Sequence, residues 1–190
     1  MKKMEEKILA EGKILPGGVL KVGSFLNQQV DIHFMREIGD EIARLYKDSG
    51  ATKILTIEAS GIPIAISAGF AMGLPVVYAK KHKGSNIGGD VYSVPVKSFT
   101  HGDTNNVVVT KEYLSPEDRI LIVDDFLAHG SALTGLISIV EQAGGTVVGC
   151  AAAIEKGFQL GGDALREQGY RVESLAIVDE MTDEGIVFRK

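Results

Sequence analysis

The chain has 190 residues, 45% of them hydrophobic, which is enough to bury one substantial core and too few for two full domains. Its formal net charge of −5 argues against a nucleic-acid or membrane-surface protein, because such partners usually require a basic face. Cys150 is the single cysteine, so an intrachain disulfide is excluded, and its apolar neighbours indicate a buried packing residue. The N-terminal lysines precede no apolar signal segment, and no apolar stretch approaches about 18 residues. We therefore expect one cytoplasmic domain over residues 1–190, with no nucleic-acid or membrane partner.

Strands and helices alternate along the chain. Residues 31–46 place Met35, Ile38, Ile42 and Leu45 at helical spacing on one face. Short apolar runs between such helical stretches are typical of buried parallel strands. We expect these strands near residues 53–57, 75–79, 119–123, 146–154 and 173–178. The alternation predicts an α/β fold with a mostly parallel central sheet flanked by helices on both faces.

A loop of small residues, Ala59, Ser60 and Gly61, follows the first of these strands and turns into a helix with Pro63 near its first turn. Small residues let backbone N–H groups approach an anion closely. Capping of an ordinary helix by Ser60 explains the same residues equally well, and the two interpretations are compatible.

The segment from about residue 80 to 111 is polar and rich in glycine. Residues 91–95 and 107–110 favour a β-ribbon, whereas the polar remainder favours a flexible lid, and a ribbon that carries the lid satisfies both. Lys80 and Lys81 leave a strand at the carboxyl edge of the sheet, where either could neutralise a bound anion.

Residues 119–135 carry the most specific pattern in the chain. Asp124 and Asp125 follow a buried strand at the edge where open α/β sheets bind ligands. The loop that comes next provides backbone N–H groups and the start of a helix for a phosphate. This loop consists of Ala128, His129, Gly130, Ser131 and Ala132. The two carboxylates would repel that phosphate but accept hydrogen bonds from vicinal ribose hydroxyls, which indicates a phosphorylated sugar as ligand.

Other interpretations of this segment are weaker. A P-loop NTPase also has an apolar strand that ends in Asp, but the chain contains no Gly-x-x-x-x-Gly-Lys-[Ser/Thr]. No Gly-x-Gly-x-x-Gly follows a strand, so a dinucleotide fold has no fingerprint. A turn with solvated aspartates remains as the non-functional alternative.

The same residues resemble the signature of the type I phosphoribosyltransferases, which bind 5-phosphoribosyl 1-diphosphate (PRPP). The resemblance implies their fold, with a small hood formed by about residues 1–35 and 155–190, and a lid at 80–111. It implies that Ala59, Ser60, Gly61 and Lys81 serve the diphosphate. It also implies Mg²⁺ carried mainly by that substrate, no dedicated protein metal site, and a homodimer.

Residues 14–31 and 153–158 narrow the resemblance to the bacterial xanthine phosphoribosyltransferases. In that group a Leu, an Asn and a Lys contact the base, and these correspond here to Leu20, Asn27 and Lys156. A lysine donor suits the 6-oxo group of xanthine, and an amide can pair with its polar edge. Taken singly, Lys156 reads as a surface lysine and Asn27 as a turn residue.

We therefore expect transfer of the phosphoribosyl group from PRPP to xanthine. Adenine is the alternative acceptor, because enzymes for adenine also have alanine at the position of Ala128, although a lysine facing the 6-position opposes an amino group. A PRPP-binding purine regulator of the same fold is a further alternative, but the chain has no room for a winged-helix domain before Leu20.

Overall fold

The computed structural model describes residues 1–81, 89–97, 104–182 and 185–190. Its centre is a six-stranded sheet with the order β10-β9-β8-β7-β3-β4. All neighbours in this sheet are parallel except β10, which runs antiparallel to β9. The strands are β3 (Lys53–Ile57), β4 (Val76–Ala79), β7 (Arg119–Leu127), β8 (Thr146–Lys156), β9 (Val172–Thr182) and β10 (Gly185–Phe188).

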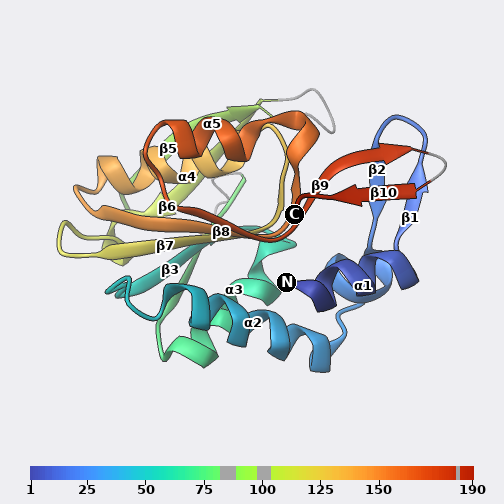
Figure 1. Cartoon of the computed structure of the whole chain (residues 1–190). Coiled ribbons are helices and arrows are strands. Elements are labelled where there is room, and N and C mark those ends of the chain that lie inside the picture. Colours follow the sequence, from blue (N-terminus) through green and yellow to red (C-terminus); the bar gives the residue numbers. More distant parts are fainter. Residues whose placement is uncertain (82–88, 98–103, 183–184) are drawn as a thin grey trace.

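Helices cover both faces of this sheet, as the sequence predicts (Figure 1). One hydrophobic core lies between the sheet and the helices α1 (Lys2–Glu11), α2 (Ile32–Tyr46) and α3 (Gly61–Met72). A second core lies on the opposite face, under α4 (Ser131–Gln142) and α5 (Gly161–Glu167). The central strands are therefore buried on both sides, which explains their continuous apolar sequences.

Helix α2 shows how local sequence sets these elements. Asp31 caps it, because its carboxylate accepts a hydrogen bond from the Phe34 backbone N–H at 3.1 Å. Met35, Ile38 and Ile42 recur at helical spacing and are all buried against the sheet. The helix predicted for residues 31–46 is confirmed.

Three strands extend further than their predicted ends. Strand β7 was expected to stop at Val123, but its pairing with β8 continues to Leu127 opposite Glu155. Strands β8 and β9 reach Lys156 and Thr182, past the predicted ends at 154 and 178. Polar residues at the carboxyl edge suggested loops, whereas ladder hydrogen bonds with a neighbouring strand keep this backbone extended. Asp124 and Asp125 consequently lie within a strand.

The ribbon predicted between residues 80 and 111 is confirmed. Strands β5 (Val91–Lys97) and β6 (Thr104–Thr110) pair antiparallel and pack against α4. A bridge from Lys80 to Val108 joins the ribbon to the end of β4. Residues 82–88 and 98–103, which form much of the predicted lid, lie outside the described residues.

Elements from both ends of the chain lie on one side of the molecule, where Figure 1 shows the hairpin of β1 (Lys13–Leu15) and β2 (Val19–Lys21) near β10. A π-helical turn, η1 (Gly23–Asn27), leads from the hairpin to α2. The amino group of Met1 donates to the carbonyl of Leu175 on β9. Short turns η2 (Lys111–Tyr113) and η3 (Gly157–Gln159) complete the elements of the described residues. Within the same residues, no helix is long and apolar enough to cross a membrane.

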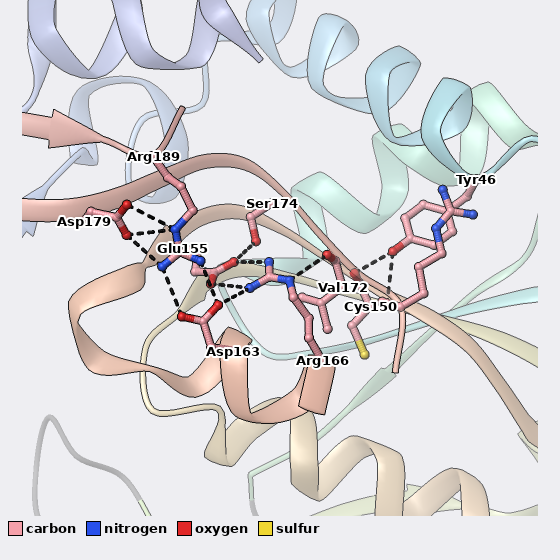
Figure 2. A network of polar contacts seen from close by, with 10 residues as sticks. Tyr46, Cys150, Glu155, Asp163, Arg166, Val172, Ser174, Asp179 and Arg189 are labelled. Atoms are coloured by element: carbon pink, nitrogen blue, oxygen red, sulfur yellow. Dashed lines mark hydrogen bonds and ion pairs between the residues drawn. The ribbon is translucent and has the colours of Figure 1, made fainter. Parts of the chain in front are cut away.

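Tyr46 joins the end of α2 to the sheet by a hydrogen bond to β8 (Figure 2), and removal of its hydroxyl tests this contact. The side chain is fully buried, and its hydroxyl donates to the Cys150 carbonyl at 2.7 Å. We expect Tyr46→Phe to lower the free energy of unfolding by about 1 kcal/mol, because one buried hydrogen bond is lost at nearly constant volume. Urea denaturation measures this loss. Tyr113→Phe, at a side chain that is 52% exposed, is the control, and equal effects would contradict the assignment.

Candidate active site

The sheet changes direction between β3 and β7. The chain passes from β3 outward to its neighbour β4 and then returns to β7 on the other side of β3. The connections that leave β3 and β7 therefore diverge and open a crevice at the carboxyl edge of the sheet. A pocket of about 260 Å³ lies there. Its lining includes Glu58, Ala59, Ser60, Lys81, Asp124, Asp125, Phe126 and the whole loop from Ala128 to Ala132.

The loop after β7 is shaped to receive an anion. Gly130 has a φ of +83°, which L-residues rarely adopt, and this turn leads directly into α4 at Ser131. The first backbone N–H groups of a helix lack intrahelical partners and carry a partial positive charge. Gly161 supports the loop from behind, because its N–H donates to the Ala128 carbonyl at 3.1 Å. The arrangement offers a phosphate site built from backbone alone.

The two aspartates differ in their surroundings. Asp124 is only 5% exposed, and one of its oxygens, Oδ1, accepts the Asp125 backbone N–H at 2.9 Å. Burial, together with the neighbouring charge of Asp125, raises the pKa of the Asp124 carboxyl well above its usual value. Asp125 is half-buried at the pocket wall. The pair thus places one buried and one half-buried carboxyl in the lining of the pocket.

The second predicted loop forms the facing wall of the pocket. Ala59 and Ser60 line it, and the peptide bond between Glu58 and Ala59 is cis. Gly61 lies behind this wall within the described structure. A Cβ at Gly61 would come within 2.9 Å of Asp124 Oδ1, so the absence of a side chain lets α3 approach the aspartate closely. Lys81 lines the pocket, and its backbone N–H donates to Glu58 Oε1 at 2.6 Å.

The three residues expected at the base form a separate group beside this pocket. Asn27 Nδ2 donates to Asp125 Oδ2 at 3.1 Å. Lys156 Nζ donates to the Gly18 carbonyl at 3.0 Å and lies 5.8 Å from the centre of the Phe126 ring. Burial lowers the pKa of Lys156. Leu20 is buried in the core on β2, in the same hairpin as Gly18. Asn27 and Lys156 are thus connected to the pocket through Asp125 and Phe126, whereas Leu20 belongs to the hydrophobic core and is not among the residues that line the pocket.

Several pocket residues were missed by the sequence analysis. Phe126 was overlooked because β7 was expected to end at Val123. In a longer strand, the alternation of side chains between the two faces places Phe126 on the same face as Asp124. Glu58, which precedes the loop of small residues at 59–61, also lines the pocket. Val96, Asn105 and Val107 come from the ribbon, and nothing in their local sequence places a ribbon over this pocket.

Comparisons with known proteins agree with this geometry. The family model described as a phosphoribosyl transferase domain matches residues 28–164. A xanthine phosphoribosyltransferase of Brevibacillus brevis is 50% identical over 188 residues, which cover 99% of this chain and 96% of that protein. A xanthine phosphoribosyltransferase of Lachnoclostridium phytofermentans is 50% identical over 191 residues, or 100% of this chain and 98% of that protein.

Solved structures show the same fold at low identity. The adenine phosphoribosyltransferase of Trypanosoma brucei, solved with AMP, pyrophosphate and ribose-5-phosphate, matches with a TM-score of 0.79 and 20% identity. The match covers 96% of this chain and 82% of that one. The Giardia lamblia enzyme, solved with 9-deazaadenine, matches with a TM-score of 0.75 and 21% identity over 94% of this chain and 98% of that one.

The raised pKa of Asp124 has a consequence for stability. The folded protein holds this proton more tightly than the unfolded chain, so stability falls as pH rises from the ordinary aspartate range through the folded pKa. We expect Asp124→Asn to raise the free energy of unfolding at pH 8 by about 0.5–2 kcal/mol, with a smaller gain near pH 4, while activity falls. Urea denaturation at both pH values measures the change.

Asp118 is the matched control for this prediction. Burial raises its pKa, but the hydrogen bonds from Lys53 and the Ser115 backbone outweigh burial, and the net shift is downward. Asp118→Asn should therefore destabilise the protein by about 1 kcal/mol at pH 7, and the loss should shrink as pH falls through the folded pKa. A destabilising Asp124→Asn would contradict our account of the buried carboxyl.

Proposed function

This chain belongs to the phosphoribosyl transferase family, and we propose that it transfers the 5-phosphoribosyl group of PRPP to xanthine. The products are xanthosine 5′-monophosphate and diphosphate. The observation that carries the proposal is that Asn27 contacts Asp125 and that Lys156 lies over Phe126, the residue after the aspartate pair on β7. The full-length relatives named for xanthine support the same acceptor.

The PRPP half of the site follows from the pocket walls. The backbone of residues 128–132 holds the 5-phosphate at the start of α4. Asp125 and Asp124 hold the 2- and 3-hydroxyls of the ribose. The loop at 59–61 and Lys81 face the diphosphate, which is the leaving group. Ribose C1 is thereby fixed between the leaving group and the base site, and catalysis arises mainly from positioning and charge stabilisation.

The base half of the site is built around Lys156. A half-buried ammonium donates more strongly to an oxygen than an exposed one, because water competes less for it. Xanthine presents an oxygen at C6 and ionises near neutrality, so a cation favours both the acceptor oxygen and the anionic base. Asn27 pairs with the polar edge, and the apolar groups of Phe126 and Leu20 border the flat face. The acidity of xanthine removes the need for a general base, and displacement at C1 proceeds with inversion.

Mg²⁺ fits the residues that are present. Asp124 and Asp125 offer oxygen ligands, which this cation prefers, and no group of three or more potential ligands exists among the described residues. Mg²⁺ commonly keeps water and substrate phosphates as its other ligands, so diphosphate and ribose oxygens would hold most of it. When bound, it neutralises negative charge on the diphosphate.

The predicted hood, about residues 1–35 and 155–190, contains all three residues assigned to the base. Residues 1–27 and 165–190 lie outside the matched family region, yet they contain Leu20, Asn27 and the strands β9 and β10. Met4, Ile8 and Leu20 share one buried cluster with Leu175 of β9, so the hood and the sheet pack as a unit. We assign residues 1–190 to one domain on this basis.

The single cysteine agrees with a cytoplasmic location. Cys150 is buried on β8, and burial raises the pKa of its thiol to about 12. It therefore stays protonated and acts in packing. A chain with no disulfide suits a reducing compartment, where nucleotide substrates are available.

Parallel assays of diphosphate release test the acceptor. With PRPP and Mg²⁺ we expect turnover with xanthine in a panel that also contains guanine, hypoxanthine and adenine. Lys156→Ala should lower kcat/KM for xanthine by about 10- to 100-fold, the range for losing a hydrogen bond to a charged group. Lys47→Ala, at an exposed lysine, is the control. Turnover with adenine alone would reject xanthine as acceptor, and PRPP binding without turnover of any base would favour a regulator.

A homodimer accounts for an unusual helix. The sequence of α3 contains no charged residue, and such helices are normally buried all round. Here Phe70 is 85% exposed and Ile66 is 44% exposed, beside Tyr78 on the edge strand β4. Gly69, Leu74 and Val76 continue this apolar surface. Because α3 starts at the loop of residues 59–61, which we assign to the diphosphate, a second copy packed on this face would also support the site.

A charge introduced on the exposed face of α3 tests the proposed dimer. We expect Phe70→Glu to convert the protein to a monomer in analytical ultracentrifugation at micromolar concentration, because it buries a charge in an apolar interface. Activity should fall with the dimer if the partner supports the diphosphate loop. Leu9→Glu, at an exposed leucine of α1, is the control. An unchanged sedimentation coefficient for Phe70→Glu would exclude this face.

A further inference from the structure

Glu155 is a buried charge next to the base-binding lysine. It lies immediately before Lys156 on β8 and is fully buried. Its carboxylate accepts two hydrogen bonds from Arg166, from Nη1 at 2.9 Å and Nη2 at 2.7 Å, and a third from the Ser174 hydroxyl. Successive residues of a strand point to opposite faces, so this pairing anchors β8 from the side opposite Lys156.

The ion pair is one end of a longer chain of charges, drawn in Figure 2. Arg166 also contacts Asp163 at 3.0 Å, and Asp163 binds Arg189 through two contacts of 2.7 and 3.1 Å. Arg189 Nε in turn contacts both oxygens of Asp179, at 3.0 and 3.1 Å. We call Glu155, Arg166, Asp163, Arg189 and Asp179 the arginine network. It joins β8, α5, β9 and the last residues of the chain.

The network encloses the turn that follows Lys156 with no spare room. A Cβ at Gly157 would lie 2.2 Å from Asp179 Oδ1, and a Cβ at Gly162 would lie 2.1 Å from Glu155 Oε1. Leu160, between these glycines, has a φ of 62°, which a leucine adopts only where its surroundings impose it. The turn at residues 157–162 is thus held from both ends by side chains of the network.

The same turn contacts residues 128–132, which we call the phosphate loop. Gly161 donates to the Ala128 carbonyl, and a Cβ at Gly161 would lie 2.5 Å from the Gly130 nitrogen. A displacement of the turn therefore moves the phosphate loop, Lys156 or both. In the proposed site, Lys156 and residues 128–132, which bind the base and the 5-phosphate of one nucleotide, therefore lie next to opposite ends of this turn.

We propose that Arg189 is a positioning residue that fixes the spacing between Lys156 and the phosphate loop by clamping the turn through Asp163 and Asp179. The inference rests on the proposed function, because it assigns Lys156 to the base and residues 128–132 to the phosphate. Arg189 is not among the pocket-lining residues of the described structure, so it acts through the turn. Its planar fork reaches two carboxylates at once, which a single ammonium does not reproduce.

Arg189→Gln is the informative variant. Asp163 and Asp179 are both about one third exposed, so water can solvate them after the change, and the protein should fold. Removal of Arg166 would instead leave the buried Glu155 without a partner of opposite charge, with only the Ser174 hydroxyl bound to it. Arg171→Gln, which breaks a comparable ion pair with Glu173 away from the turn, is the control for a general loss of stability.

Ligand binding by calorimetry separates positioning from stability. We expect Arg189→Gln to weaken the binding of xanthosine 5′-monophosphate by about tenfold, within the range for coupled hydrogen-bond networks. This ligand must contact Lys156 and the phosphate loop at the same time. The binding of ribose 5-phosphate, which uses the loop at 128–132 and the two aspartates but not Lys156, should weaken by less than about threefold. In turnover, xanthine KM should rise while kcat changes little, whereas partial unfolding would lower the apparent kcat at constant KM.

A double-mutant cycle with Lys156→Ala completes the test. If Arg189 acts through Lys156, Arg189→Gln should weaken nucleotide binding by less than about threefold once Lys156 is absent. Three results would overturn the inference: multiplicative effects of the two substitutions, equal losses for the nucleotide and for ribose 5-phosphate, or a loss matched by Arg171→Gln. Wild-type turnover with xanthine is measured separately. If another purine is the acceptor, the proposed function fails, and the same cycle run with the nucleotide of that purine still decides the role of Arg189.

Discussion

The parallel pairing of β7 with β3 on one side and β8 on the other is the constraint on which the site depends. It places the ends of three neighbouring strands at one edge of the sheet. The loop at 59–61 follows β3, Asp124 and Asp125 lie on β7 shortly before the loop at 128–132, and Lys156 ends β8. Parallel strands require long crossovers, and here those crossovers are the helices whose first turns face the ligand. Fold and substrate site are therefore consequences of the same hydrogen-bond ladder.

The site itself opposes stability. Asp124 is held in a protein interior beside a second carboxylate, and the ammonium of Lys156 is partly removed from water. Two hydrophobic cores, one on each face of the sheet, offset these unfavourable terms. The charges behind the site are arranged differently, because Glu155 is matched by Arg166 with full hydrogen bonding. The buried Glu155 therefore has a partner of opposite charge, whereas the neighbour of the buried Asp124 is a second carboxylate.

Much of the fold follows from local sequence, and the site follows only in part. Strand β3 and helix α2 have strong periodic signals and occur where the sequence places them. The end of β7 was misjudged because Asp124 and Asp125 look like loop residues, and the pairing that extends the strand comes from a neighbour about 30 residues further along the chain. The contact between Asn27 and Asp125 spans 98 residues, so no local pattern reveals it. The phosphate loop has a local physical signature, whereas the base residues were found by resemblance to a family.

Lys156 also determines where the N-terminal hairpin sits. One of its three N–H donors is committed to the carbonyl of Gly18, in the turn between β1 and β2, 138 residues earlier in the chain. In the proposed site, that carbonyl orients the ammonium before a base binds, and the purine shares the same ammonium with it. The proposal therefore makes the length and shape of the two-stranded hairpin a determinant of base selectivity, which an insertion at that turn would alter with every pocket residue unchanged.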